Sequence, residues 1–238
     1  MPKPGEFSYY ERIGAEGRED GLNKPFSEER RGALLMEAGA VCLLLPAPPC
    51  RVLECGCGPG WLTYFLAKSG YQVTGQDVNA QAVNLARSRP LFRTMPNAPE
   101  FVVSDYERLP FENQFDAVVF FDSLHHATDL AAALKSAYRA LKPGGRMIAS
   151  EPGVGHAKSS HEVVALYDVT DKDTPPSLTR RFGFQAGFSE GYVYPHAALL
   201  GRSLYRRQDG LRALISRFSS AAFHTVFAQR NGIVVLVK

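Results

Sequence analysis

The 238-residue sequence contains no apolar run long enough to cross a membrane. Its most apolar helical segment, residues 32–45, is interrupted by Glu37 and is shorter than the ~20 residues that a bilayer span needs. Residues 1–14 are polar and lack the apolar core of a signal peptide. We therefore expect a cytoplasmic protein without membrane insertion.

Cysteines are few, and charge of either sign is nearly balanced. The four cysteines lie in the first quarter of the chain, which does not suggest a secreted disulfide framework. No C-x-x-C or H-x-x-H segment accompanies Cys50, Cys55 and Cys57, so no metal site is predicted. The net charge of +3 neither requires nor excludes nucleic acid. These totals describe an ordinary globular protein, long enough for one large α/β domain.

Strand and helix patterns alternate through the middle of the chain. The expected strands are 51–54, 71–77, 100–104, 115–121 and 146–150, followed later by 191–194 and 232–238. Helical patterns separate the first strands, and Asn79 is placed to cap one of these helices. Such alternation predicts a parallel, doubly wound α/β sheet.

We expect a single domain over residues 1–238. Its expected parts are an N-terminal arm without periodicity (1–26), a helix capped by Ser27 (27–46), a ligand-binding core (51–151) and a C-terminal part (152–238).

The C-terminal part holds a helical insertion at about 196–231 that is rich in arginine. Asp209 is the single acid there against six arginines, which are Arg202, Arg206, Arg207, Arg212, Arg217 and Arg230. Two interpretations stay open: a helix packed on the sheet edge with a solvated basic face, or a lid over the substrate. The arginines would suit an anionic substrate.

Residues 52–60, V-L-E-C-G-C-G-P-G, place three glycines at alternate positions between a strand and a helix. Glycine lets the backbone approach a ligand closely. The spacing differs from the dinucleotide pattern G-x-G-x-x-G, and Glu54 favours a cationic or hydroxyl-bearing ligand over a pyrophosphate. Ligands of such sheets bind beyond the carboxyl ends of the strands, so the residues that follow each strand are the candidates for chemistry.

Five segments, taken in order, resemble those of the class I S-adenosylmethionine-dependent methyltransferases, most closely the small bacterial type with an L-H-H segment. They are residues 52–60, V-T-G-Q-D (73–77), S-D-Y-E-R-L-P-F (104–111), F-D-A-V-V-F-F-D-S-L-H-H (115–126) and L-K-P-G-G-R (141–146). Glu54 stands where the family more often has Asp, and it keeps the charge. The resemblance implies a Rossmann-like seven-stranded sheet, mostly parallel with an antiparallel last strand. It also implies S-adenosylmethionine as cofactor.

The resemblance also implies roles for single residues. Asp77 would accept both ribose hydroxyls, Asp105 would accept from the adenine amino group, and Glu54 would organise the glycine turn. The full cofactor-binding set is Glu54, Gly56, Cys57, Gly58, Gly60, Asp77, Val78, Asp105, Tyr106 and Asp122. Two alternatives stay open: Asp77 could cap the next helix, and Asp105 could start a turn.

Methyl transfer to a hydroxyl is helped by a general base, for which histidine is well tuned. The candidates are His125 and His126 after the fourth strand and His156 after the fifth. Alternatively, these histidines cap or pack against helices. Tyr9 and Tyr10 either cover the cofactor or pack on the sheet.

The methyl acceptor leaves little trace in the sequence. The amino-methyltransferase segment N/D-P-P-Y and the Pro-Cys nucleophile are both missing after the fourth strand, so we expect no nucleic acid partner. We expect an oxygen or nitrogen of a small molecule to accept the methyl group. A sugar or glycan intermediate is suggested because residues 151–156 and 167–176 look similar to methyltransferases of glycan assembly. An NAD-type oxidoreductase and a non-catalytic cofactor-binding protein remain alternatives, and no oligomeric state is predicted.

Overall fold

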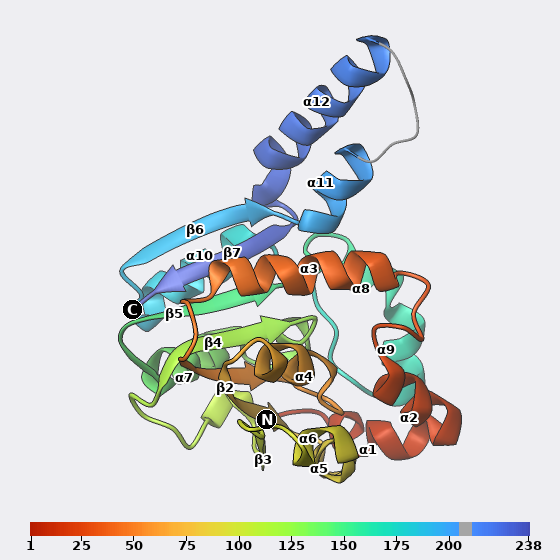
Figure 1. Cartoon of the computed structure of the whole chain (residues 1–238), viewed down its shortest axis with the longest axis vertical. Coiled ribbons are helices and arrows are strands. Elements are labelled where there is room, and N and C mark those ends of the chain that lie inside the picture. Colours follow the sequence, from red (N-terminus) through yellow and green to blue (C-terminus); the bar gives the residue numbers. More distant parts are fainter. Residues whose placement is uncertain (205–210) are drawn as a thin grey trace.

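The computed structural model describes residues 1–204 and 211–238, with all side chains in these ranges except those of 202–204, 211–214 and 217. These residues form a seven-stranded sheet in the order β3-β2-β1-β4-β5-β7-β6 (Figure 1). The strands are β1 Arg51–Cys55, β2 Gln72–Asp77, β3 Glu100–Val103, β4 Phe115–Phe121, β5 Leu141–Ser150, β6 Glu190–Pro195 and β7 Gly232–Val237. The first five pair in parallel, and β7 runs antiparallel to β5 and β6. The predicted fold class is confirmed.

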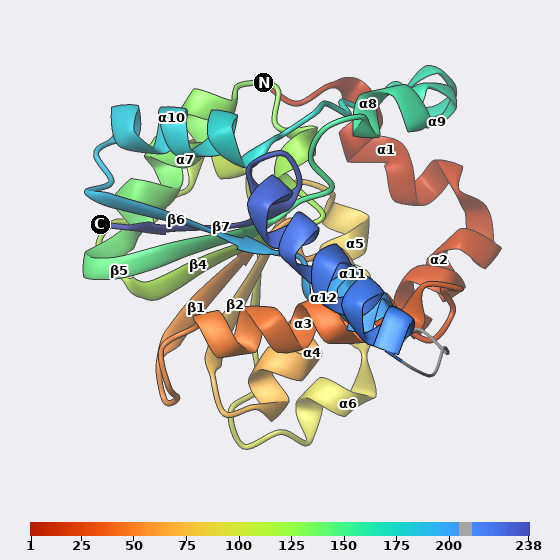
Figure 2. The ribbon, with the colours of Figure 1, turned by 90° about the horizontal axis from the view of Figure 1, so that it is seen from above.

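Helices cover both faces of this sheet. Figure 2 shows α7 and α10 on one face and α3 and α4 on the other. The α-helices are α1 Pro4–Arg12, α2 Gly14–Asn23, α3 Arg31–Leu44, α4 Trp61–Lys68, α5 Ala80–Ser88, α6 Pro90–Arg93, α7 Leu130–Ala140, α8 His156–Ser159, α9 His161–Tyr167, α10 Pro176–Ala186, α11 Ala197–Leu204 and α12 Leu211–Val226. Short 3-10 turns are η1 Tyr106–Arg108, η2 Leu124–His126 and η3 Phe227–Gln229. Among the described helices, none combines the length and apolar character of a membrane span.

The central strands are apolar on both sides because each side meets a helical layer. Successive side chains of a strand point to opposite faces. Leu53 and Phe120 therefore join the core under α7 and α10, while Val52 and Val119 join the core under α3 and α4. Because both faces of these strands are buried, the strand ends are held in place, and so are the residues that follow each strand.

The N-terminal arm, whose sequence shows no periodicity, is helical. Helix α1 lies beside α9 at one side of the molecule (Figures 1 and 2). Asn79 Nδ2 donates to the carbonyls of Glu6 and Phe7, at 3.0 and 3.1 Å, so tertiary contacts hold α1 in place. The predicted Ser27 cap is wrong, because α3 begins at Arg31 and the Ser27 hydroxyl donates to the Asp20 carbonyl. Asn79 caps α5 as predicted.

The insertion forms two helices, α11 and α12, and α12 extends away from the sheet (Figure 1). Ile215 and Phe218 are 60% and 65% exposed. Of the two interpretations left open, packing on the sheet edge is therefore not seen for these two side chains. Arg206, Arg207 and Asp209 lie outside the described residues, as do the side chains of Leu211, Leu214, Arg202, Arg212 and Arg217.

Candidate active site

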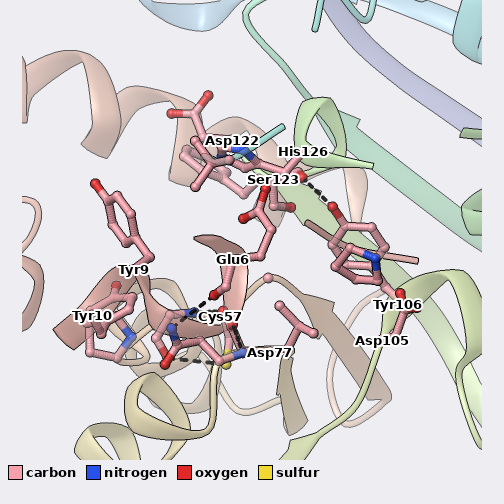
Figure 3. A pocket seen from close by; sticks show the side chains of 18 of the residues that line it. Glu6, Tyr9, Tyr10, Cys57, Asp77, Asp105, Tyr106, Asp122, Ser123 and His126 are labelled. Atoms are coloured by element: carbon pink, nitrogen blue, oxygen red, sulfur yellow. Dashed lines mark hydrogen bonds between the residues drawn. The ribbon is translucent and has the colours of Figure 1, made fainter. Parts of the chain in front are cut away.

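A cavity of about 270 Å³ lies where β1, β2 and β4 end, and helix α1 borders it (Figure 3). Nine of the predicted site residues line it: Gly56, Cys57, Gly58, Asp77, Val78, Asp105, Tyr106, Asp122 and His126. The predicted residues Glu54, Gly60, His125 and His156 lie outside its wall. Most of the site residues that were predicted from the strand ends therefore lie in one cavity.

The glycine turn after β1 is shaped for close approach of a ligand to the backbone. Gly56 and Gly58 have φ of +74° and +52°, a region that favours glycine. A Cβ on Gly56 would lie 2.5 Å from Cβ of Ser123, and one on Gly58 would lie 3.0 Å from Tyr10 Oη. The Gly56 and Cys57 N–H groups donate to the Gln76 carbonyl at 2.7 and 2.9 Å, which ties the turn to β2.

Asp77 presents a carboxylate with one hydrogen bond on each oxygen. Oδ2 accepts from Gly58 N–H and Oδ1 from Asn79 N–H, both at 2.8 Å. The two carboxylate oxygens together have about four acceptor positions, so Asp77 can accept from a ligand hydroxyl in the cavity as well. Burial raises the pKa of Asp77. The helix-capping role is taken by Asn79.

Glu54 is buried beneath the turn and does not line the cavity. Thr63, in the first turn of α4, donates its hydroxyl to Glu54 Oε2 at 2.5 Å. Burial raises the pKa of Glu54 to about 8. A cationic group brought near this carboxyl would favour its ionised form.

Asp105 and Tyr106 form the wall after β3. Asp105 Oδ1 accepts from Glu107 N–H at 2.8 Å, so this residue does start a turn, η1. Tyr106 Oη donates to the Ser123 carbonyl at 3.0 Å, and burial raises the pKa of Tyr106 well above its usual value. Asp122, across the cavity, has a φ of +47°, a strained conformation for a residue other than glycine.

Sequence reasoning missed Glu6, which α1 carries into the cavity. Figure 3 shows its side chain near the centre, between Ser123 and Asp77. Glu6 Oε1 accepts from Thr170 N–H at 2.7 Å, and burial raises the pKa of Glu6 to about 7. Nothing in the polar pattern of residues 4–12 signals this position. Tyr9 and Tyr10 line the cavity beside it.

The three candidate histidines have different surroundings. His125 is buried, and its Nδ1 lies 2.6 Å from Glu151 Oε2. Burial lowers the pKa of His125, but the Glu151 carboxylate outweighs it and the net shift is upward. His126 Nδ1 lies 2.5 Å from the Thr170 carbonyl, which can only accept, so Nδ1 carries the proton and Nε2 the lone pair. His156 pairs with Asp171 at 3.0 Å.

Comparison with known proteins agrees with this geometry. The family described as "Methyltransferase domain" matches residues 53–149. The ubiquinone/menaquinone biosynthesis C-methyltransferase UbiE of Pseudomonas savastanoi pv. phaseolicola is 39% identical over 194 residues, covering 78% of this chain and 70% of that protein. This chain belongs to the class I S-adenosylmethionine-dependent methyltransferases. Its cofactor is therefore S-adenosylmethionine, and the methyltransferase prediction prevails over the NAD-type oxidoreductase.

Other relatives differ in the acceptor that their names state. The malonyl-[acyl-carrier protein] O-methyltransferase of Erwinia billingiae is 28% identical over 185 residues, covering 77% of this chain and 69% of that protein. The structure of Haemonchus contortus phosphoethanolamine N-methyltransferase 2 superposes with a TM-score of 0.61 at 24% identity. That match covers 84% of this methyltransferase, which spans about half (52%) of the nematode chain, and it supports the fold alone.

Proposed function

We propose that this methyltransferase binds S-adenosylmethionine in the cavity between the glycine turn and helix α1. The observation that carries the proposal is Asp77, an acceptor-only carboxylate that lines the cavity beside Gly58 and is held by the Gly58 and Asn79 N–H groups. The positive-φ glycines support it, because Gly56 and Gly58 line the cavity in a conformation and at a spacing that leave no room for a Cβ. Asp105 and Tyr106 would hold the adenine end.

When bound, the cofactor supplies a methyl group on a sulfonium, a carbon already activated toward nucleophiles. The chain's own residues then have to orient the acceptor and exclude water. Tyr9 and Tyr10 of α1 and Tyr106 of η1 supply apolar ring surface around the cavity. We propose that α1 is the element that closes the site against solvent.

The charge of the cavity wall limits the charge that the methyl acceptor can carry. Five carboxyl groups line it, and Lys24 is the one lysine or arginine among its described residues; the acids are Glu6, Asp77, Asp105, Glu107 and Asp122. A negative wall favours neutral or cationic ligands over anions. We therefore propose transfer to an oxygen or nitrogen of a neutral or cationic small molecule, and a sugar hydroxyl satisfies this condition. The anionic acceptor suggested by the arginine-rich insertion finds no support in the described wall.

A quinone-type ring is the second candidate acceptor. The 39% identity to a quinone-biosynthesis C-methyltransferase favours it. Trp61, Phe121 and the tyrosines of the cavity would pack against such a ring. In either case, His126 is the histidine that we propose contacts the acceptor, because it alone of the three candidates lines the cavity.

Calorimetric titration tests the cofactor proposal. We expect S-adenosylmethionine and its demethylated product to bind with one site per chain, and NAD not to bind. Methyl-labelled cofactor is then incubated with a panel of sugar derivatives, amines and demethylated quinone head groups, and label transfer is counted. Binding of NAD alone, or no binding of either cofactor form to folded protein, would overturn the proposal.

A further inference from the structure

Beside the cavity, three imidazole rings meet one carboxylate. His125 and His126 come from η2, His156 from α8, and Asp171 from the segment after α9. The His125 ring centroid lies 4.2 Å from that of His126 and 4.6 Å from that of His156. Three atoms that can ligate a metal lie within 4.8 Å of one another, and they come one each from His125, His126 and Asp171. Segments 45 residues apart in the sequence thus bring together the donor types of a metal site.

The orientation of both η2 histidines follows the pattern of metal-bound imidazoles. Such histidines usually donate the N–H of one ring nitrogen to a carboxylate or carbonyl, which leaves the other nitrogen for the metal. His125 Nδ1 lies 2.6 Å from Glu151 Oε2, and His126 Nδ1 lies 2.5 Å from the Thr170 carbonyl. Glu151 also accepts backbone N–H groups of the same turn, so the partner itself is held in place. The Nε2 atoms are the ones left to ligate.

Asp171 supplies an independent observation. Its side chain is 6% exposed, and its Oδ1 accepts no hydrogen bond from the described part of the chain. His156 Nε2 lies 3.0 Å from this oxygen, yet it too makes no hydrogen bond with described residues. The His156 ring lies within ion-pair distance of Asp171 Oδ1 without the geometry of a hydrogen bond, so this oxygen is available to a bound cation.

We propose that His125, His126 and Asp171 bind a divalent transition-metal ion. Imidazole nitrogens with one carboxylate suit zinc, cobalt, iron or nickel, whereas magnesium and calcium prefer oxygen ligands. Because His126 also lines the cavity, the ion would border the acceptor subsite. If the proposed function holds, the ion is placed to bind an oxygen or nitrogen of the acceptor.

The test uses the full chain after treatment with a chelator. Co²⁺ is titrated while its visible absorption is followed, and Zn²⁺ affinity is measured by competition. We expect one equivalent of Co²⁺ with a spectrum of nitrogen and oxygen ligands, without the thiolate charge-transfer band that the cysteines would give. Asp171→Asn and His126→Gln should each weaken binding by about 100-fold or more, since loss of even an outer-shell partner costs 10- to 100-fold.

His161→Gln serves as the matched control, because His161 is an exposed histidine of the neighbouring helix α9. It should bind Co²⁺ like the wild type. Folding of each variant is checked by circular dichroism, and S-adenosylhomocysteine binding is measured on the same samples. Wild-type protein that binds S-adenosylhomocysteine but not Co²⁺ overturns this inference alone. Unchanged Co²⁺ affinity in folded Asp171→Asn also overturns it. Failure to bind S-adenosylhomocysteine instead counts against the proposed function.

Discussion

Asp77→Asn is the most informative single change for the cofactor pocket. The wild-type carboxylate uses one lone pair of each oxygen for the N–H groups of Gly58 and Asn79, and leaves the other two for a diol. In the amide, an NH₂ group replaces one oxygen and faces a backbone N–H donor. The variant therefore loses one backbone bond, one ligand bond and the negative charge.

The expected loss of affinity follows from these contacts. A hydrogen bond to a charged group contributes about 1.5–3 kcal/mol, and an unsatisfied buried donor costs a similar amount. The lost backbone bond weakens the free and the bound protein alike, so the affinity loss is that of the ligand bond, about 1.5–3 kcal/mol, and the Kd for S-adenosylhomocysteine should be roughly 10- to 150-fold weaker. Isothermal titration calorimetry at fixed pH and ionic strength measures this directly.

Asp116→Asn is the matched control. Asp116 also accepts a backbone N–H, from Arg51 at 2.8 Å, together with the Lys142 ammonium at 2.7 Å. It lies near the start of β4, at the sheet edge opposite the cavity, so its substitution should leave the Kd unchanged. Asp77→Asn protein that is folded, shown by an intact cooperative thermal transition, and that binds with wild-type affinity would refute the assignment of the diol to Asp77.

Three further predictions follow from the same geometry. Gly56→Ala and Gly144→Ala both place alanine at a φ of +74°, but the new Cβ lies 2.5 Å from Ser123 in the first variant and has no atom within 4 Å in the second. In urea unfolding, Gly144→Ala should lower the free energy of unfolding by about 1–2 kcal/mol, whereas Gly56→Ala should lower it further and abolish cofactor binding. Equal losses in the two variants would contradict the close-approach argument. The folded pKa of Glu54 is about 8 against an ordinary 4.5, so its protonated carboxyl stabilises the protein below pH 4.5 relative to high pH, and that contribution is lost as pH rises through about 8. Glu54→Gln should remove roughly 5 kcal/mol of this pH dependence, whereas Glu28→Gln should not. Glu151 accepts from His125 and from three backbone N–H groups in a buried site, and Glu151→Gln weakens this acceptor. The free energy of unfolding should therefore fall by about 3–5 kcal/mol. A fall below about 1 kcal/mol, or an equal fall in Glu162→Gln, would argue against Glu151 as the group that holds this turn.

The residues that follow the strands were predictable because they depend on local patterns. Strand β4 is apolar except for Asp116 and ends before Asp122, and β2 ends at Asp77, so both strands could be placed from the sequence pattern. The parallel arrangement then brings these ends to one edge of the sheet. The same logic placed Gly56 and Gly58 beside Asp77.

Helix α1 was unpredictable for a physical reason. Its sequence has charged and glycine residues without an apolar stripe, so no pattern distinguishes it from an irregular arm. Contacts from distant segments hold it: Asn79 binds its carbonyls, and Arg12 donates to the carbonyls of Leu166 and Tyr167. Glu6, Tyr9 and Tyr10 reach the cavity only through these contacts.

The sequence by itself determined the fold, the glycine turn and the family. These depend on periodicity and on the residue types at strand ends, and both are visible within a few consecutive residues. Tertiary structure alone decided that His126 faces the cavity while His125 is bound to Glu151, although the two are adjacent in sequence. It also brought Asp171 to the histidines, across 45 residues. Such pairings depend on how loops pack over the sheet edge, and no local pattern records that packing.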